Sequence, residues 1–388
     1  MYPCSIQSNT GPVHQGAHTE EGIDMGHMIA HALIGNTSKR KGWIGQTDGT
    51  LPTYEGPIPV AEVQRRLFNW KAISVPTGNF IPVGVDQLGE PGVIMMEDGS
   101  LAKAVVTPGK KGIVRSDDFT EMGRHSSSYS DHDYNEWLIE KVGHALQGSM
   151  EIWAALTLKN GAQAAVEIAL DETMHDETTG LNFFPFMLAR TSLDGSLATS
   201  YSVHSRVLEC DNQFPQVMAE ARKTGRQYKV KHTAHSHRQD HTLGLREAMN
   251  IMDLQATQFQ EFTRTLIGIK TTRKQWIDVL DIIEPPAPAG SSKVKVTKTE
   301  NRREALDAIY KGEGEIGALS GGFGNNVFNG FQAVNTYQQR EVSVRGTSRL
   351  ERVYDRSIRG DLQSSDAQVL DAYARVLDMP ELRELVLV

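Results

Sequence analysis

Cysteine is almost absent from this 388-residue chain, which contains only Cys4 and Cys210. Two cysteines this far apart predict no disulfide framework and are consistent with a reducing compartment. Long hydrophobic runs are also missing, because no stretch approaches the roughly 18 apolar residues of a membrane-spanning helix. The N-terminal residues show no basic segment followed by an apolar one, as a secretory signal would. We therefore expect a protein of the cytoplasm that does not enter a membrane.

Sequence motifs of several enzyme classes are missing as well. No G-x-x-x-x-G-K-[ST] phosphate loop occurs, and TPGKKG at 107–112 lacks its spacing. The chain has neither a G-x-S-x-G nucleophile motif nor a C-x-x-C pair. The glycines at 320–330 do not open a helix after a clear strand as a dinucleotide fingerprint does, so they predict a flexible loop. The sequence thus identifies no catalytic residue and no cofactor, and it favours a function that requires no nucleotide hydrolysis.

A basic surface over the whole chain is absent too, since the net charge is −8. Any site for nucleic acid must therefore be local. Hydrophobic residues make up 39% and charged residues 23% of the chain, which is typical of a globular protein. The length exceeds that of one ordinary core, so we expect two units or one elaborated domain.

Hydrophobic periodicity predicts an α+β fold. The strand candidates are 72–75, 80–85, 103–106, 150–158, 162–170, 182–192, 196–208 and 227–233. The helix candidates are 25–33, 59–69, 133–146 with Asp133 as N-cap, 214–223 and a long helix from 237 to 266 that continues toward 283. LDGS at 193–196 predicts a hairpin between two of these strands. We expect an antiparallel meander of about five strands covered by the long helix.

Composition predicts four regions along the chain. They are an N-terminal arm with a small α/β region (1–100), a central sheet with the long helix (101–283), a Pro- and Lys-rich linker (284–300) and a helical C-terminal extension (301–388). The linker is assigned from EPPAPAGSSKVKVTKTE, whose prolines, small residues and lysines are typical of extended segments. An arginine-rich segment of the C-terminal extension also looks helical.

Histidines are concentrated in YKVKHTAHSHRQDH (228–241), which holds four of the chain's thirteen. One interpretation is a metal site formed by His235, His237 and His241 with a carboxylate. The His237/His241 spacing would place both rings on one helix face, but no glutamate follows His237 as in metalloproteases, and Arg238 would repel a cation. A second interpretation is a solvated strand end and loop.

The third interpretation is a surface for anions, and it leads. Residues 222–246 contain seven basic residues and one acidic residue, a local charge of +6 in a chain whose total is −8. On an extended strand Lys229, Lys231 and Thr233 share one face, and Tyr228 lies on the other with Val230 and His232. Such a row of cations can neutralise successive phosphates, while an aromatic ring can stack on a base.

Several motifs, in this order, resemble those of the phage/plasmid-like protein family, a domain-of-unknown-function family of bacteriophages and plasmids. The matching pieces are Trp43-x-Gly45, LFNWKAISVP (67–76), the helix ending near His144, GSMEIWAALTL (148–158), TSLDGSLA (191–198), SRVLECDN (205–212), KHT (231–233) and GFQAVNTY (330–337). The match extends from about Lys41 to the C-terminus. One departure is Ile44, where the family usually has histidine, and this argues against a metal or catalytic role for that position.

The resemblance implies a mobile-element protein in the cytoplasm of a bacterial host, and its arrangement looks like that of single-strand annealing proteins. We therefore expect a non-catalytic protein that binds single-stranded DNA or RNA and promotes annealing in phage recombination or replication. The predicted contacts are Arg226, Lys229, Lys231 and Arg238 to phosphates, Tyr228 as a stacking ring, His232 and His235 as hydrogen-bonding groups, and Arg206 and Asn212 at the neighbouring strand end.

A homo-oligomer is expected, with the N-terminal arm or the arginine-rich segment as the contact between copies. Two alternatives stay open. One is a metal-dependent enzyme that acts on nucleic acid through the histidine cluster. The other is a non-enzymatic protein that binds a host protein.

Overall fold

The computed structural model describes residues 32–38, 51–146, 151–169, 174–207, 228–314, 323–342 and 361–386. Its centre is a seven-stranded antiparallel sheet, the main sheet, in the order β1-β6-β7-β9-β10-β11 with β8 added beside β9. The strands are β1 (Ala32–Ile34), β6 (Glu151–Leu158), β7 (Gln163–Ala169), β8 (Met174–Asp176), β9 (Leu181–Ser192), β10 (Thr199–Val207) and β11 (Tyr228–Val230). The predicted α+β meander is confirmed, and it runs from β6 through β7, β9 and β10 to β11.

The hairpin predicted at LDGS joins β9 to β10. The two strands pair antiparallel from Ser200 opposite Arg190 onward. Gly195 has a φ of +73°, a conformation that glycine adopts without steric cost. Asp194 stabilises the turn, since its carboxylate accepts the backbone N–H of Ser196 at 2.9 Å.

One predicted helix is partly wrong. Residues 25–31 of that prediction lie outside the described residues, but Ala32–Ile34 form a strand instead of a helix. Leu33 lies opposite Ala155 of β6, and all three residues of β1 are buried. A short apolar run does not distinguish a buried strand from a helix, and here pairing with β6 decides it.

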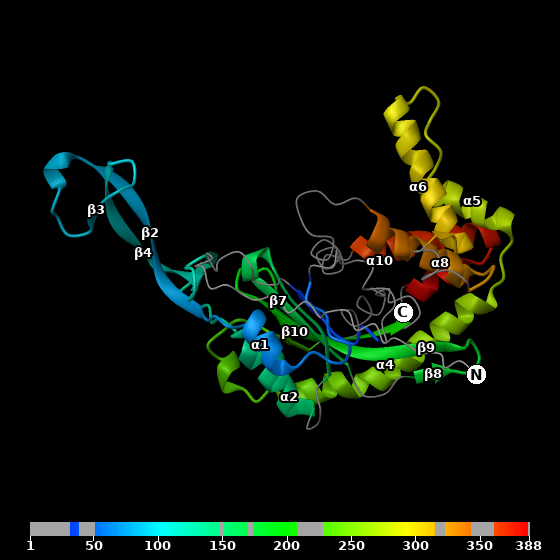
Figure 1. Ribbon diagram of the computed structural model, residues 1–388, viewed down its shortest axis with the longest axis horizontal. Coiled ribbons are helices and arrows are strands. Elements are labelled where there is room, and N and C mark those ends of the chain that lie inside the picture. The colour runs from blue at the N-terminus through cyan, green and yellow to red at the C-terminus, as the bar shows by residue number, and fades with distance from the viewer. Residues whose placement is uncertain are drawn as a thin grey trace, which may run out of the picture.

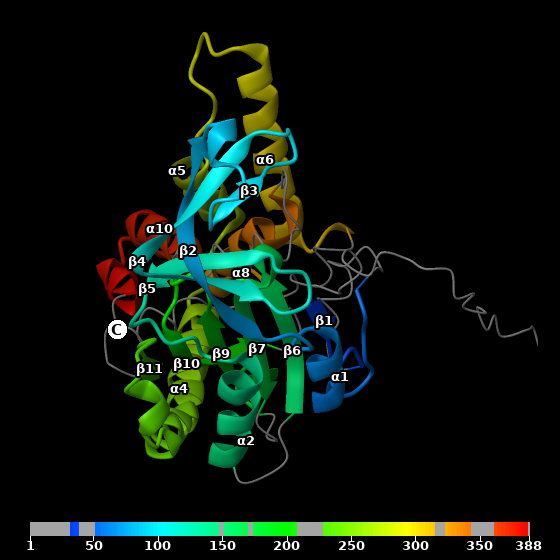
Figure 2. The ribbon, with the colours of Figure 1, turned by 90° about the vertical axis from the view of Figure 1, so that its left-hand side faces the viewer.

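Helices cover one face of the main sheet (Figures 1 and 2). A π-helix (Asn135–Glu140) continues into α2 (Lys141–Leu146), and Asp133 accepts the N–H of Glu136 at 3.0 Å, as expected of the predicted cap. The second covering helix, α4 (Thr242–Gly268), contacts β9 and β10. It begins later than predicted, because 236–238 form a separate 3-10 turn.

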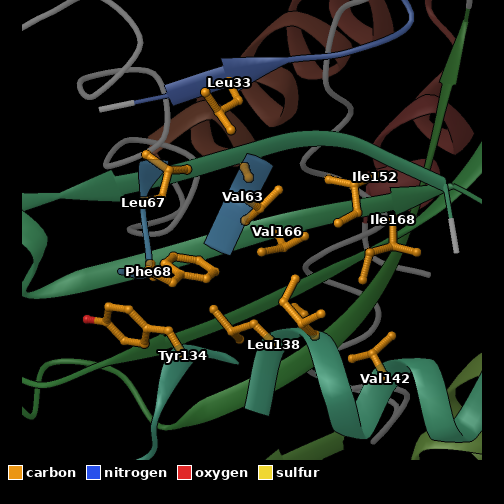
Figure 3. Packing of buried hydrophobic residues seen from close by; sticks show 14 of the residues in the cluster. Leu33, Val63, Leu67, Phe68, Tyr134, Leu138, Val142, Ile152, Val166 and Ile168 are labelled. Carbon is orange, nitrogen blue, oxygen red and sulfur yellow. The ribbon is translucent and has the colours of Figure 1, made fainter. Parts of the chain in front are cut away.

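The core under these helices is apolar. Figure 3 shows Leu138 and Val142 directed toward Val166 and Ile168 of the sheet. All four side chains are 0% exposed, and burial of each contributes about 1.5–3 kcal/mol. Helix α1 (Val60–Arg66), predicted over 59–69, packs on the same core.

A second sheet, the arm sheet, projects from the main body (Figures 1 and 2). It contains β2 (Ala72–Val83), β3 (Val93–Met95), β4 (Leu101–Arg115) and β5 (Glu121–Ser126), in the order β2-β4-β3 with β5 on β4. The sequence predicts 72–75 and 80–85 as separate strands, whereas 72–75 and 80–83 both belong to β2 and Val85 begins a 3-10 turn. The predicted boundary at residue 100 passes through this sheet, since β3 pairs with β4.

The C-terminal region is helical, as predicted. Its elements are α5 (Arg273–Ile283), α6 (Lys293–Lys311), α8 (Val327–Thr336), a π-helical segment (Tyr337–Glu341), α10 (Asp361–Leu377) and a 3-10 segment (Pro380–Val386). Their shared core includes Trp276, Phe328, Phe331 and Tyr373. The long helix does not run on to residue 283, because 269–272 are not helical and α5 begins with a capping box at Thr272.

Two predicted loops are partly helices. Residues 293–300 of the expected linker begin α6, where Ser292 accepts the N–H of Lys295 at 3.3 Å. The lysines of this segment lie on an exposed helix, which accommodates them as well as a linker does. Their presence therefore does not distinguish a linker from a helix. Likewise α8 begins inside the predicted loop 320–330, after Asn326 accepts the N–H of Asn329 at 2.9 Å. In the described part of the chain, no helix combines the length and hydrophobicity needed to cross a membrane.

Candidate nucleic-acid interface

Strand β11 lies at the edge of the main sheet, where it pairs with β10 through Ser200 opposite Lys229 (Figure 2). Its side chains alternate as predicted. Lys229 and Lys231 are exposed, whereas Val230 is buried and Tyr228 is half-buried. The two lysines are therefore held on one side of the strand by the burial of Val230 between them.

The segment after β11 adds further polar groups to this edge. A 3-10 turn over Ser236–Arg238 leaves His235 and Arg238 exposed, while the Ser236 hydroxyl donates to the carbonyl of Thr233 at 2.5 Å. Within the described residues, Lys229, Lys231 and Arg238 form no ion pair. Their positive charge is therefore not neutralised by the described parts of the fold.

The position of Tyr228 does not support its predicted role as a stacking surface. Its hydroxyl lies 2.6 Å from Nδ1 of His241, and its ring packs against Gly244. Nε2 of His241 lies 2.7 Å from the carbonyl of Ser236, which can only accept. His241 therefore donates from Nε2 and accepts the Tyr228 proton at Nδ1. The ring of Tyr228 thus helps to fix the start of α4.

The ring of His232 is half-buried and is also engaged within the fold. It lies in a stack of five rings, the ring column, formed by Trp137, His132, His232, Tyr129 and His125. Successive centroids are 3.7, 4.1, 5.0 and 3.8 Å apart. Both faces of the His232 ring are therefore covered, and burial lowers its pKa. A direct contact between this ring and nucleic acid is not supported.

Hydrogen bonds attach the ring column to the β9–β10 hairpin. His132 contacts the hydroxyl of Thr199 at 2.6 Å and that of Ser236 at 2.8 Å. At the outer end of the column, Nε2 of His125 donates to the carbonyl of Leu193 at 2.7 Å. Because His125 belongs to β5, the column joins the arm sheet, the main sheet and the segment after β11.

The histidines of the alternative metal site do not converge. His241 uses both ring nitrogens as described above, His237 contacts the carbonyl of Asp131 at 3.1 Å, and His235 contacts Gln239 at 3.1 Å. In the regions that the structure describes, no group of three histidine, cysteine or carboxylate side chains could hold a metal ion.

Of the other predicted nucleic-acid contacts, only Arg206 lies within the described residues. Arg206 lies in β10 opposite Phe184. Asn212, Arg226 and the predicted helix at 214–223 lie outside the described residues, as does Cys210.

Lys110 and Lys111 are cations near this edge that sequence reasoning did not assign to the site. On β4, Lys111 lies opposite His125 and Lys110 opposite Ser126. The ring column and a bridge between Tyr129 and Thr233 connect this part of β5 to the segment after β11. The sequence TPGKKG (107–112) contains no signal that Lys110 and Lys111 lie close to residues 231–233 in the fold. Lys110 is exposed, and Lys111 donates to the Ser74 hydroxyl at 3.0 Å.

A comparison with protein families finds one match over more than half of the chain. The model of DUF932, described as a domain of unknown function, matches residues 123–358. This range includes the end of β5, the ring column, the main sheet from β6 to β11 and much of the helical region. No curated protein and no solved structure matches the chain.

Proposed function

Since the chain belongs to the DUF932 family, whose domain has no known function, we propose from its own geometry that the protein binds single-stranded nucleic acid. One observation carries the proposal: Lys229 in the edge strand β11, Lys231 directly after it and Arg238 in the following 3-10 turn are exposed and have no ion pair within the described residues. A row of such cations binds successive phosphates and releases counterions.

The proposed contacts are to phosphates and not to bases. Tyr228 and His232 are engaged in the fold, so the described part of this edge offers no stacking ring. Phosphate contacts position a strand without reading its sequence. The bound strand keeps its base edges available for pairing, which supports the finer proposal that the protein promotes annealing.

The biological setting follows from the sequence motifs. Their order resembles the phage/plasmid-like family, so we assign the protein to a mobile element that acts in the host cytoplasm during recombination or replication. His235 is exposed between Lys231 and Arg238 in the sequence and supplies a further hydrogen-bonding group.

The test is fluorescence anisotropy of a labelled single-stranded oligonucleotide at several salt concentrations. Lys229→Ala/Lys231→Ala should weaken binding, and the slope of log affinity against log salt should fall by about 0.7 for each lost contact. Lys295→Ala/Lys298→Ala is the matched control, because it removes the same charge from exposed lysines of α6. Figure 2 places α6 away from the β11 edge.

Two results would reject the proposal. One is the absence of binding by the wild type at low salt. The other is an equal loss of affinity in both double variants, which would show that only net charge matters.

A further inference from the structure

The arm sheet exposes an unusual amount of apolar surface. Ten of the fourteen large hydrophobic side chains that are exposed in the described residues lie between 73 and 106. They are Ile73, Phe80, Ile81, Val85, Leu88, Ile94, Met95, Met96, Val105 and Val106. Clustered exposure of this kind marks an interaction surface more often than chance.

The register of the strands gathers some of these side chains on one face, which we call the Phe80 face. Phe80 lies opposite Ala104, Gly78 opposite Val106, and Ile94 opposite Ala102. Phe80 is 57% exposed and Val106 is 60% exposed. No described helix packs on this part of the arm sheet, which projects away from the helices in Figure 1. A small sheet needs a covered face to be stable.

The free edge of β2 is poorly suited to pairing with another strand. Pro76 and Pro82 lie within β2 and lack the N–H that an added strand would require. Prolines on an edge strand oppose strand addition. A partner of the arm sheet should therefore cover its face.

A pocket lies where β2 and β4 lose their regular register, between Pro76 and Gly78. Its volume is about 290 Å³, and its lining includes Gly78, Phe80, Val106 and Gly112. A Cβ at position 78 would lie 2.3 Å from the carbonyl oxygen of Val105, so glycine is required there. The pocket can accept an apolar side chain from a partner.

Charge is distributed unevenly along the arm sheet. Asp86 and Glu97 lie in the turns at its tip, and Lys110 lies in β4 near the irregular register. None of the three forms an ion pair within the described residues. Two arm sheets that run antiparallel would therefore place the acidic tip of each against the lysine of the other.

We propose that two copies of this chain form a dimer by packing their Phe80 faces together around a two-fold axis, with the arm sheets antiparallel. This contact is isologous, because each copy contributes the same surface, and such dimers are the commonest protein oligomers. The apolar side chains supply the burial, and the tip acids and Lys110 select the antiparallel orientation. The inference does not depend on nucleic-acid binding.

The first test is the molar mass of the full chain, measured by sedimentation equilibrium over a range of concentrations. The wild type should be a dimer, and Phe80→Glu should be monomeric with an unchanged circular dichroism spectrum. Val294→Glu is the matched control, since Val294 is 65% exposed on α6, and this variant should remain dimeric. A monomeric wild type, or a dimeric Phe80→Glu variant, would overturn the proposal.

The second test uses charge reversal to establish the orientation. Lys110→Glu and Asp86→Lys/Glu97→Lys should each weaken self-association by about tenfold or more, because like charges meet twice in each dimer. An equimolar mixture of these two variants should associate as tightly as the wild type, since opposite charges then face each other. Failure of the mixture to associate would refute the antiparallel arrangement, even if Phe80→Glu is monomeric.

Discussion

His132 has no exposed surface, and its ring lies between Trp137 and His232. Burial, followed by the effects of His232 and His237, lowers the pKa of His132 from 6.5 to about 2. The folded protein therefore keeps this ring neutral, whereas the unfolded chain takes up a proton below about pH 6.5. His132 therefore has a structural role: its neutral ring stacks between two aromatic rings and forms hydrogen bonds inside the core.

The expected consequence is a pH-dependent stability. As pH falls below 6.5, the unfolded state binds a proton that folded His132 does not, so the free energy of unfolding should decrease. One such group contributes a slope of about 1.4 kcal/mol per pH unit. Urea unfolding between pH 7 and 5.5 gives the free energy of unfolding as a function of pH. The slope of this dependence should be shallower for His132→Gln than for the wild type. The exposed control His235→Gln should retain the wild-type slope, and equal slopes in all three proteins would contradict the assignment.

At the scale of an element, α8 shows how tightly a helix can be enclosed, because all ten residues of Val327–Thr336 are buried. Gly330 is the point of closest approach. A Cβ there would lie 1.8 Å from the hydroxyl oxygen of Tyr373 in α10 and 3.0 Å from the ring of Trp276 in α5. Glycine at this position allows the three helices to pack together.

We predict that Gly330→Ala destabilises the protein by about 1–3 kcal/mol, because the added methyl group overpacks the helix contact. Gly143→Ala in α2 is the matched control. Apart from its chain neighbours and its own helix backbone, no atom of the described residues lies within 4 Å of a Cβ at position 143. The higher helix propensity of alanine should therefore stabilise the protein by up to about 1 kcal/mol. Denaturant midpoints measure both changes. A stabilising Gly330→Ala substitution would show that the helices separate easily.

At the scale of the whole molecule, α4 connects two cores. Leu245 near its start belongs to the core of the main sheet, whereas Phe259 and Leu266 belong to the helical core. An ion pair reinforces this connection: Nη2 of Arg264 in α4 donates to Oδ1 of Asp176 in β8 at 2.6 Å. The Asp176 side chain is 0% exposed, and Arg264, Thr179 and Thr178 lower its pKa.

Arg264→Ala should therefore decrease the free energy of unfolding by about 2 kcal/mol, because a buried carboxylate loses its charged hydrogen-bond donor. Arg302→Ala is the control. Arg302 is 55% exposed and lies 3.4 Å from Glu284, and exposed pairs of this kind contribute less than about 1 kcal/mol. Thermal or urea unfolding measures the difference, and similar losses in the two variants would argue against a special role for the Arg264–Asp176 pair.

Elements with a strong local signal were predicted from the sequence. The short strand-like runs that became β6, β7, β9 and β10 and the Asp-Gly turn between the last two identified the meander, because both signals act over short distances in the sequence. The alternation of residues along an extended strand correctly predicted that Lys229 and Lys231 are exposed on one face and that Val230 is on the other. The predictions were wrong at β1, in residues 293–300 of α6 and at the start of α8. There the prediction relied on local composition, whereas strand pairing, helix capping and burial determine the structure.

The amino-acid sequence alone was sufficient to predict the α+β class, most strands of the main sheet and the exposure of Lys229 and Lys231, since these follow from local periodicity. Only the tertiary structure showed that the rings of Tyr228, His232 and His241 are engaged in contacts within the fold. Their partners, such as Tyr129, Thr191 and Ser236, come from several parts of the chain, and a histidine has the same local pattern whether it is exposed or stacked. The exposure of the apolar face of the arm sheet also cannot be predicted locally, because it depends on which distant parts of the chain pack against the sheet.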